Sequence, residues 1–301
     1  MVARTSFGPD VVIAGAARSG TSALAAQLSV HPNIDAGKVK EPNYFSRHLD
    51  RGEQWYESNF RSRSDSVLRL DASTSYTSPL YPHAVEHLAT VSPEAYVIYS
   101  VRQPSERALS HYLLRRHYFH IDDAPTFGEA LRDTSLYVDQ GDYSHWLPLL
   151  SNSFGPERLL VVPFELITAQ PRHATEEVCR QLGIESLPDA AKEGELHRNA
   201  VVEYRNEHIR RIAGKFRHSR AYPAVRSLVG ADRLRKARGL ITRPPTLPTR
   251  DESMQSCSPD QLTQLQALDN RAGEATRTYL EAQDERLGLH WAPLSFAAAT
   301  T

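Results

Sequence analysis

The segment with the clearest chemistry in this sequence is Gly-Ala-Ala-Arg-Ser-Gly-Thr-Ser at positions 15–22, which follows an apolar run at 11–14. The apolar run is typical of a buried strand, and a helical pattern begins at Thr21. A strand, a turn of small residues and a helix N-terminus can bind phosphate, because free backbone N–H groups and the positive end of the helix meet there. An ordinary tight turn is the alternative, but two glycines, an arginine and a Thr-Ser pair favour the phosphate site.

The same loop lacks the residue that contacts a γ-phosphate. Loops that bind nucleoside triphosphates read Gly-x-x-x-x-Gly-Lys-Ser/Thr, and their lysine reaches the β- and γ-phosphates. Here Thr21 occupies the lysine position, and the cation of the loop is Arg18. We therefore expect a nucleotide with one 5′-phosphate region rather than ATP or GTP. The predicted ligands are Ala17, Arg18, Ser19, Gly20, Thr21 and Ser22.

A second anion-binding pattern lies about 80 residues further on. Arg102 follows the apolar run 96–101, Pro104 suits the first turn of a helix, and Ser110 lies two turns into that helix. Arg102, with its forked guanidinium, and Ser110, with its hydroxyl, can bind one anion together. A salt bridge for Arg102 and a neutral role for Ser110 are the alternative, and the phosphate loop upstream favours two ligands.

Taken together, these motifs resemble those of the sulfotransferases that use 3′-phosphoadenosine-5′-phosphosulfate (PAPS). The loop is similar to their 5′-phosphosulfate loop, which has Lys or Arg at the place of Arg18 followed by Ser/Thr-Gly-Thr. The stretch from Arg102 to Ser110 is similar to their 3′-phosphate motif, Arg-x-Pro-x-x-Arg-x-x-Ser-x-Tyr. The resemblance implies PAPS as donor, adenosine 3′,5′-bisphosphate as product, and no metal.

A third segment, Lys-Glu-Pro-Asn-Tyr-Phe at 40–45, resembles the Lys-Glu-x-x-Phe-Phe segment of heparan-type and related bacterial sulfotransferases. In that family the Glu is taken as the base that deprotonates the acceptor hydroxyl, which implies this role for Glu41. A carboxylate suits the role if partial burial raises its pKa toward working pH. The alternative is that Glu41 is a surface acid paired with Lys40.

One position departs from the heparan-type pattern. Ala72 stands where those enzymes have a Lys directed at the sulfuryl group, so a second catalytic cation must be Lys40 or Arg18. No His matches the base of the aryl and steroid sulfotransferases. The triplet His197-Arg198-Asn199 resembles a short loop ahead of the family's C-terminal cap, and we count these three residues as predicted nucleotide ligands. The resemblance spans nearly the whole chain and thins between residues 205 and 250.

The elements that must position these motifs alternate between strands and helices. Short apolar runs predict strands at 11–15, 67–70, 96–101 and 159–163. Helical periodicity predicts helices at 21–31, 80–90, 105–117, 143–154 and 171–182, and a polar helix at 259–286. This order predicts an α/β fold with a three-layer, doubly wound parallel sheet. We expect one sulfotransferase domain, with an α/β nucleotide-binding core at 1–190 and a helical cap at 191–301, where the strand signal ends.

Composition excludes a bulk electrostatic partner, because 35 Lys and Arg face 36 Asp and Glu. Residues 205–243 are an exception, with twelve basic and two acidic side chains. Such a segment suits a membrane surface, another anionic partner or simply solvated helix faces. We do not expect nucleic acid, because regular aromatic interleaving is lacking.

Cysteine and histidine usage indicates neither a disulfide scaffold nor a metal. Cys179 and Cys257 are the only cysteines, and the pair His117-x-x-His120 has no further ligands at zinc spacing. The N-terminal residues have no long apolar segment, and no run approaches the ~20 apolar residues of a spanning helix. We therefore expect a soluble, cytoplasmic protein.

Two functions of other classes stay open at this point. A P-loop kinase or NTPase would need the lysine that Thr21 replaces. A non-catalytic module that senses PAPS or its desulfated product would keep both phosphate motifs and an inert Glu41. The acceptor is equally open: saccharide, lipid, peptide and secondary-metabolite hydroxyls all fit the sequence.

Overall fold

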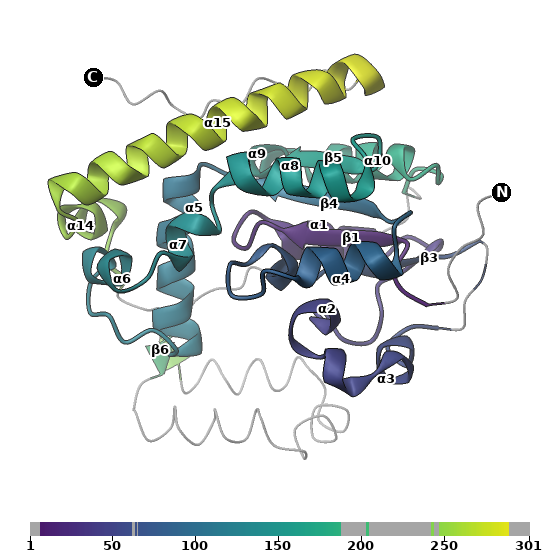
Figure 1. Cartoon of the computed structure of the whole chain (residues 1–301), viewed down its shortest axis with the longest axis horizontal. Coiled ribbons are helices and arrows are strands. Elements are labelled where there is room, and N and C mark those ends of the chain that lie inside the picture. The colour runs from purple at the N-terminus through teal and green to yellow at the C-terminus, as the bar shows by residue number, and fades with distance from the viewer. Residues whose placement is uncertain are drawn as a thin grey trace.

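A five-stranded parallel sheet in the order β2-β3-β1-β4-β5 forms the centre of the molecule (Figure 1). The computed structural model describes residues 7–61, 64, 66–187, 203–204, 242–243 and 247–288. The strands are β1 (Val11–Gly15), β2 (Ile34–Asp35), β3 (Leu68–Asp71), β4 (Tyr96–Val101) and β5 (Leu159–Pro163). The predicted doubly wound parallel sheet is confirmed. Of these five strands only the two-residue β2 was not predicted, and β3 begins and ends one residue later than expected.

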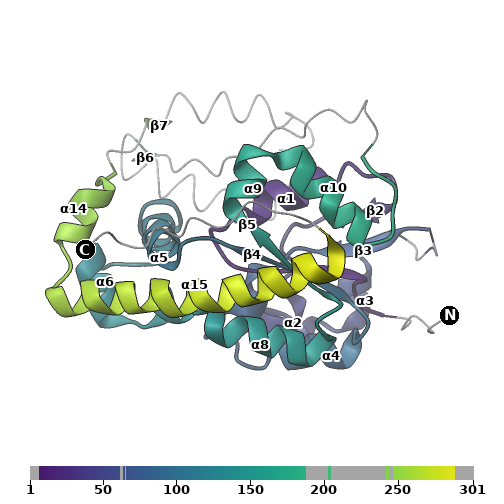
Figure 2. The same cartoon turned by 90° about the horizontal axis from the view of Figure 1, so that it is seen from above.

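Helices cover both faces of this sheet. Figure 2 shows α1 (Thr21–Leu28) and α10 (Pro171–Gln181) on one side of the strands, and α4 (Ala84–Val91) and α8 (Tyr143–Phe154) on the other. Each of these four helices begins within four residues of its predicted start, because its apolar face has the helical period. The shorter helical segments were not predicted: α2 (Tyr44–Arg47), η1 (Leu49–Arg51), α3 (Glu53–Glu57), η2 (Thr74–Thr77), α6 (Phe127–Asp133), α7 (Leu136–Asp139), α9 (Phe164–Ala169) and α14 (Arg250–Gln255).

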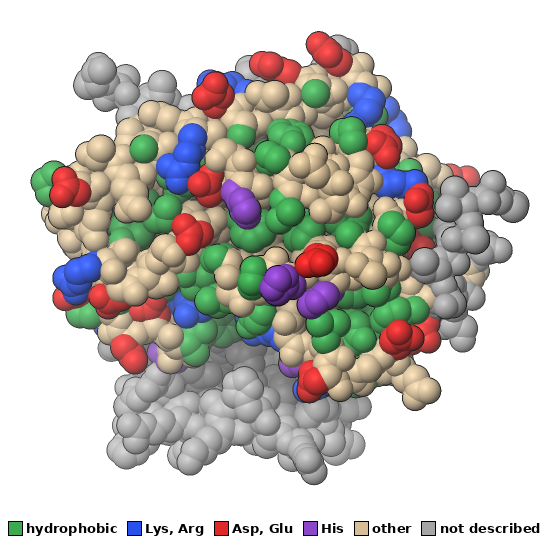
Figure 3. All heavy atoms as spheres, viewed as in Figure 1, with side chains coloured by type: hydrophobic (Ala, Val, Ile, Leu, Met, Phe, Trp, Pro, Cys, Tyr) green, Lys and Arg blue, Asp and Glu red, His purple; other side chains and the backbone are tan. Residues whose placement is uncertain are grey.

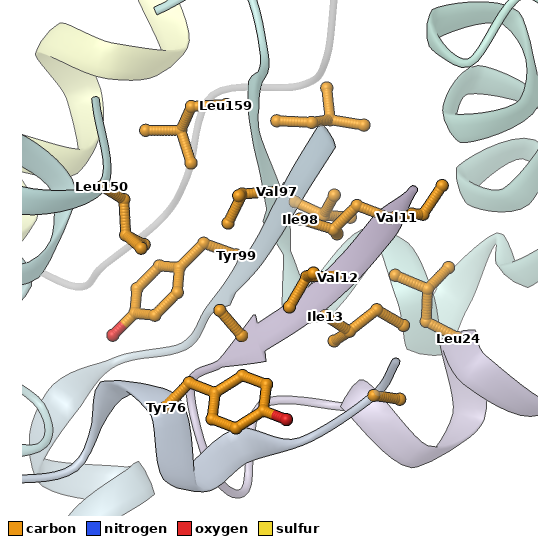
Figure 4. Packing of buried hydrophobic residues seen from close by; sticks show 14 of the residues in the cluster. Val11, Val12, Ile13, Leu24, Tyr76, Val97, Ile98, Tyr99, Leu150 and Leu159 are labelled. Carbon is orange, nitrogen blue, oxygen red and sulfur yellow. The ribbon is translucent and has the colours of Figure 1, made fainter. Parts of the chain in front are cut away.

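The core is built on β1 and β4, whose side chains are buried on both faces. Every residue of β1 is buried, as expected of a central parallel strand between two helical layers. Figure 4 shows Ile13 of β1 beside Leu24 of α1, and Tyr99 of β4 on the side of Leu150 from α8. The strand ends that carry the predicted phosphate motifs are therefore fixed by close packing.

The helix after β4 changes its winding in the middle. The predicted helix at 105–117 is α5 (Pro104–Leu113), which begins with Pro104 in its first turn, followed by a π-helical segment, η3 (Leu114–Phe119). The wider segment ends at His120, whose φ of 55° is left-handed. π-Helical turns are rare and are frequently found at functional sites.

The long C-terminal helix closes one edge of the sheet. Helix α15 (Pro259–Leu287) runs past α5, α8 and β5, as Figures 1 and 2 both show. Gln283 accepts a 2.8 Å hydrogen bond from the Val161 N–H and donates a 3.1 Å bond to the Val161 carbonyl, so it pairs the exposed backbone of edge strand β5. Asp269 accepts from the N–H and hydroxyl of Ser105 at 2.8 and 2.6 Å and thereby caps α5.

Two short strands correct the expectation that strand structure ends near residue 190. β6 (Glu203–Tyr204) pairs antiparallel with β7 (Thr242–Arg243). The division into a core and a cap stays a prediction, and most of the basic stretch 205–243 lies outside the described residues. Within the described part, no helix is long and apolar enough to cross a membrane. Acidic and basic side chains are interspersed on the face in Figure 3, in keeping with the formal net charge of −1.

Candidate active site

The loop between β1 and α1 presents backbone N–H groups at the end of the central strand. Arg18 and Gly20 have left-handed φ values of 75° and 84°. The first N–H groups of α1, at Thr21 and Ser22, have no partner within the helix. A Cβ at Gly20 would lie 3.2 Å from the side chains of Phe164 and Ile167. The loop therefore has the shape and the donors of an anion cradle.

Arg18 connects this loop with the second predicted motif. Its Nε donates a 3.0 Å hydrogen bond to Ser110 Oγ, and Arg102 Nη1 donates a 3.5 Å bond to the Arg18 carbonyl. Burial lowers the pKa of Arg18, and the positive charges of Arg102 and Arg107 lower it further. A bound anion would relieve this repulsion, so the cluster of three guanidinium groups favours a multiply charged anion.

Arg102 is held on both sides at the end of β4. Its guanidinium lies 4.7 Å from the centroid of the Phe164 ring and 3.5 Å from Glu106. Glu106 also forms an ion pair with Arg250. The side chain is less than one quarter exposed, so a ligand phosphate would find its donors already oriented.

Arg107 is a residue that our sequence analysis missed. It is completely buried, and its guanidinium donates to the carbonyl oxygens of Ala17, at 3.4 Å, and Tyr137. Burial lowers its pKa. Arg107 therefore stabilises the phosphate loop through its hydrogen bond to the Ala17 carbonyl. The signal was present, because the 3′-phosphate pattern Arg-x-Pro-x-x-Arg carries a second arginine at this position.

Glu41 lies in a backbone turn that a neighbouring amide stabilises. Its φ of 56° is left-handed, and Asn43 Nδ2 donates a 2.7 Å hydrogen bond to the Glu41 carbonyl. The carboxylate is 2.9 Å from Lys40 Nζ and about one third exposed. The pairing with Lys40 that the sequence left open is therefore present, and the same carboxylate also lines the cavity described below.

A buried acid fixes Asn43 through a short chain of hydrogen bonds. Asp71 accepts from Ser73 Oγ at 2.6 Å, and Ser73 Oγ accepts from the Asn43 N–H at 3.0 Å. The hydroxyls of Tyr56 and Tyr76 also donate to Asp71, at 2.9 and 2.7 Å. Burial raises the pKa of Asp71 to about 6; its hydrogen bonds oppose the shift, and the negative charge of Glu41 adds to it. No local pattern in the sequence indicates this network.

One cavity of about 270 Å³ brings several predicted residues together. Its lining includes Ala17, Arg18, Thr21, Ser22 and Glu41. Ser19, Gly20, Lys40, Arg102 and Ser110 are outside the lining, and the Ser19 side chain is fully buried. The predicted ligands His197, Arg198 and Asn199 lie outside the described residues.

The same cavity contains a histidine that the sequence did not single out as a site residue. His111 lines it, and the buried Nδ1 atom has no hydrogen-bond partner among the described residues. Burial and three neighbouring arginines hold the His111 pKa well below its usual value, so the ring is neutral. His117 and His120 border a different cleft, and no group of three potential ligands in the described residues could hold a metal ion.

Comparisons with known proteins agree with this geometry. Residues 8–206 match a family model described as a sulfotransferase domain. Human heparan sulfate glucosamine 3-O-sulfotransferase 3B1 is 29% identical over 195 residues, which are 60% of this chain and 47% of the relative. The bifunctional heparan sulfate N-deacetylase/N-sulfotransferase 1 of Caenorhabditis elegans is 26% identical over 199 residues, 60% of this chain and 22% of the relative. The chain thus spans about half, or less, of these relatives.

A solved structure has a similar fold. A sulfotransferase from Alicyclobacillus acidocaldarius superposes with a TM-score of 0.53 at 23% identity, covering 75% of this chain and 96% of that chain. At this identity the likeness concerns the fold, and it agrees with the parallel sheet and its flanking helices.

Proposed function

The chain belongs to the sulfotransferase domain family, and from this premise we propose that it transfers the sulfuryl group of PAPS to an acceptor hydroxyl. One observation carries the proposal: a single cavity is lined by Arg18, by the first residues of α1 and by Glu41. A cation and helix N-terminus for the leaving phosphate, and a carboxylate for the acceptor proton, are the two groups that this reaction needs.

The residues present fit the donor that we propose. The N–H groups of Gly20, Thr21 and Ser22 would hold the 5′-phosphate, and Arg102 with Ser110 would hold the 3′-phosphate. The 3.0 Å hydrogen bond from Arg18 to Ser110 supports this assignment of donors to the two phosphates, because it brings both sets of donors within the span of one nucleotide. PAPS would supply an activated sulfuryl group bonded through oxygen to its 5′-phosphate.

Transfer depends mainly on positioning and electrostatics, by analogy with phosphoryl transfer. Arg18 would stabilise the negative charge that develops on the departing phosphate as the bond from sulfur to the bridging oxygen breaks. Glu41 would accept the proton of the acceptor hydroxyl as its oxygen bonds to sulfur. Lys40, 2.9 Å from Glu41, is the candidate for a second cation, since Ala72 holds the place of the family lysine.

The class of acceptor and the cellular location are separate proposals. Two of the relatives are named for heparan sulfate, so a saccharide hydroxyl is a candidate, as are lipid and secondary-metabolite hydroxyls. We do not expect nucleic acid as a partner, and we propose a cytoplasmic location. An anionic or membrane contact through residues 205–243 also stays a prediction.

Ligand binding and turnover separate this proposal from its rivals. We expect adenosine 3′,5′-bisphosphate to raise the melting temperature strongly and ATP with Mg²⁺ to raise it weakly, because Thr21 replaces the lysine that contacts a γ-phosphate. We then expect labelled PAPS to transfer its sulfuryl group to members of an acceptor library. Stabilisation by ATP alone would favour a kinase, and bisphosphate binding without turnover would favour a sensor.

A further inference from the structure

The cavity that contains Arg18 and Glu41 is bordered by an unusual amount of exposed apolar surface. Among the described residues, seven large hydrophobic side chains are exposed: Val30, Val39, Leu49, Leu80, Phe119, Ile121 and Leu262. Three of the seven line this one cavity, namely Leu80 (56% exposed), Phe119 (53%) and Ile121 (58%). Scattered apolar side chains are normal on a surface, but apolar side chains gathered at a cavity indicate a binding site.

The local fold holds these side chains at the cavity. Phe119 is the last residue of η3, and the Ile121 N–H donates a 3.0 Å hydrogen bond back to the Arg115 carbonyl. Leu80 follows η2, on a segment 39 positions earlier in the chain than Phe119. Two further leucines of the lining, Leu114 and Leu136, are buried. Five large apolar residues from three segments of the chain therefore share one cavity.

The remaining lining is polar. Asn43, Thr74, Ser75 and Ser78 contribute amide and hydroxyl groups. Arg18 is assigned to the departing phosphate, so among the described lining residues Arg47 and Arg115 are the cations that remain for an acceptor. Arg47 lies 5.2 Å from the Tyr81 ring, and Arg115 donates a 3.2 Å hydrogen bond to the Tyr137 hydroxyl. Two cations are fewer than the row that a polyanionic chain would require for its charges.

From this combination of apolar and polar lining residues, and resting on the proposed function, we infer that the acceptor is an amphipathic alcohol. Its hydroxyl-bearing head lies among Glu41, Asn43 and Ser75, and its alkyl or aromatic body contacts Leu80, Phe119 and Ile121. Contact with apolar body atoms removes both surfaces from water, and each buried methylene is worth roughly a fourfold gain in affinity. The apolar residues thus select the class of acceptor, and Glu41 acts on its hydroxyl.

A matched pair of glucosides tests the inference, because hexyl and methyl β-D-glucoside differ only in the alkyl chain. Calorimetry with adenosine 3′,5′-bisphosphate present gives their affinities without any turnover, and transfer from labelled PAPS gives kcat/KM. We expect the hexyl compound to be favoured by about 50–100-fold in affinity, as for about three buried methylenes. The preference should fall at least about fivefold in Phe119→Ser and in Ile121→Ser, and stay unchanged in the control Leu262→Ser on α15.

The outcomes separate the inference from the proposed function. Equal affinity for the two glucosides in the wild-type protein would overturn the inference, and so would a hexyl preference that all three variants keep. Preferred transfer to an anionic glucosamine oligosaccharide would overturn it as well, and would leave the proposed function intact. Hexyl selectivity in binding without transfer from PAPS to any acceptor would support the apolar site and contradict the sulfotransferase proposal.

Discussion

Arg18 Nε and Ser110 Oγ lie 3.0 Å apart, although 92 positions separate the two residues in the sequence. The contact joins the loop after β1 to the helix after β4, which are neighbouring strands in the sheet. Ligand sites in open parallel sheets form beyond the carboxyl ends of the strands. The 5′ and 3′ phosphates of one nucleotide would therefore be bound by donors that already contact each other.

Arg102→Ala should weaken the binding of adenosine 3′,5′-bisphosphate by about 2–5 kcal/mol, because it removes one side of a partly buried charged pair. Adenosine 5′-phosphosulfate has no 3′-phosphate, so its affinity should barely change. Calorimetry with both ligands measures the difference, and Arg172→Ala on α10 is the control. Equal losses for the two ligands would exclude Arg102 from the role.

Gly20→Ala should destabilise the fold and weaken bisphosphate binding. Gly20 has a φ of 84°, and an added Cβ would lie 3.2 Å from Phe164 and Ile167. A left-handed non-glycine residue costs on the order of 1–3 kcal/mol. Gly288 is the matched control, since its φ of 62° and ψ of 37° are also left-handed helical but nothing lies within 4 Å of an added Cβ. Denaturant unfolding should give a larger loss for Gly20→Ala than for Gly288→Ala, and a smaller loss would contradict the crowding at Gly20.

The loss of the loop lysine predicts the response to nucleotides and chelators. Thr21 stands where an NTPase has its lysine, and Arg18 provides the positive charge. ATP hydrolysis should therefore be absent, and EDTA should leave sulfuryl transfer unchanged. Phosphate-release and transfer assays with EDTA or added Mg²⁺ measure both. Metal-dependent release of the γ-phosphate would contradict the proposed function.

Asp71 should make stability depend on pH in an unusual direction. Burial raises the pKa of Asp71 from 3.8 to about 6, so the folded protein holds this proton more tightly than the unfolded chain. Stability from this group is lost as the pH rises from about 4 to about 6, by about 3 kcal/mol in total.

Asp71→Asn removes that titration but keeps the shape of the side chain. The difference in unfolding free energy, wild type minus variant, should therefore fall as the pH rises through this window and be constant above it. Urea unfolding at several pH values from 4 to 8 measures the difference. A difference that is constant over the whole range, or one that grows with pH, would show that the Asp71 pKa is not raised.

The sequence predicted the parts of this protein that depend on local patterns. The strand and loop from Val11 to Ser22 and the pattern from Arg102 to Ser110 are continuous in the chain, so their spacing carries the information. The long helices were also predictable from local sequence, because apolar residues recur along them with the helical period. The fold class followed from the order of these elements.

The parts that could not be predicted depend on contacts between distant segments. Gln283 pairs with Val161 across 122 positions, and nothing near either residue indicates the other. The chain of hydrogen bonds from Asp71 to Asn43 likewise links separate segments. The apolar lining of the cavity was missed because Leu80 and Phe119 read as ordinary surface positions until the fold brings them together. Arg107 was the one missed residue with a local signal.

Glu41 decides between an enzyme and a sensor, and Glu41→Gln tests it with little change in size or shape. The variant cannot take a proton, so turnover of labelled PAPS should fall by roughly 10²–10⁴-fold while bisphosphate affinity stays within about twofold of wild type. The exposed acid Glu53 at the start of α3 provides the control, and Glu53→Gln should turn over like wild type. Single-turnover transfer at saturating donor is the most direct measurement. Glu41→Gln protein that binds bisphosphate normally and transfers the sulfuryl group at the wild-type rate would contradict the account.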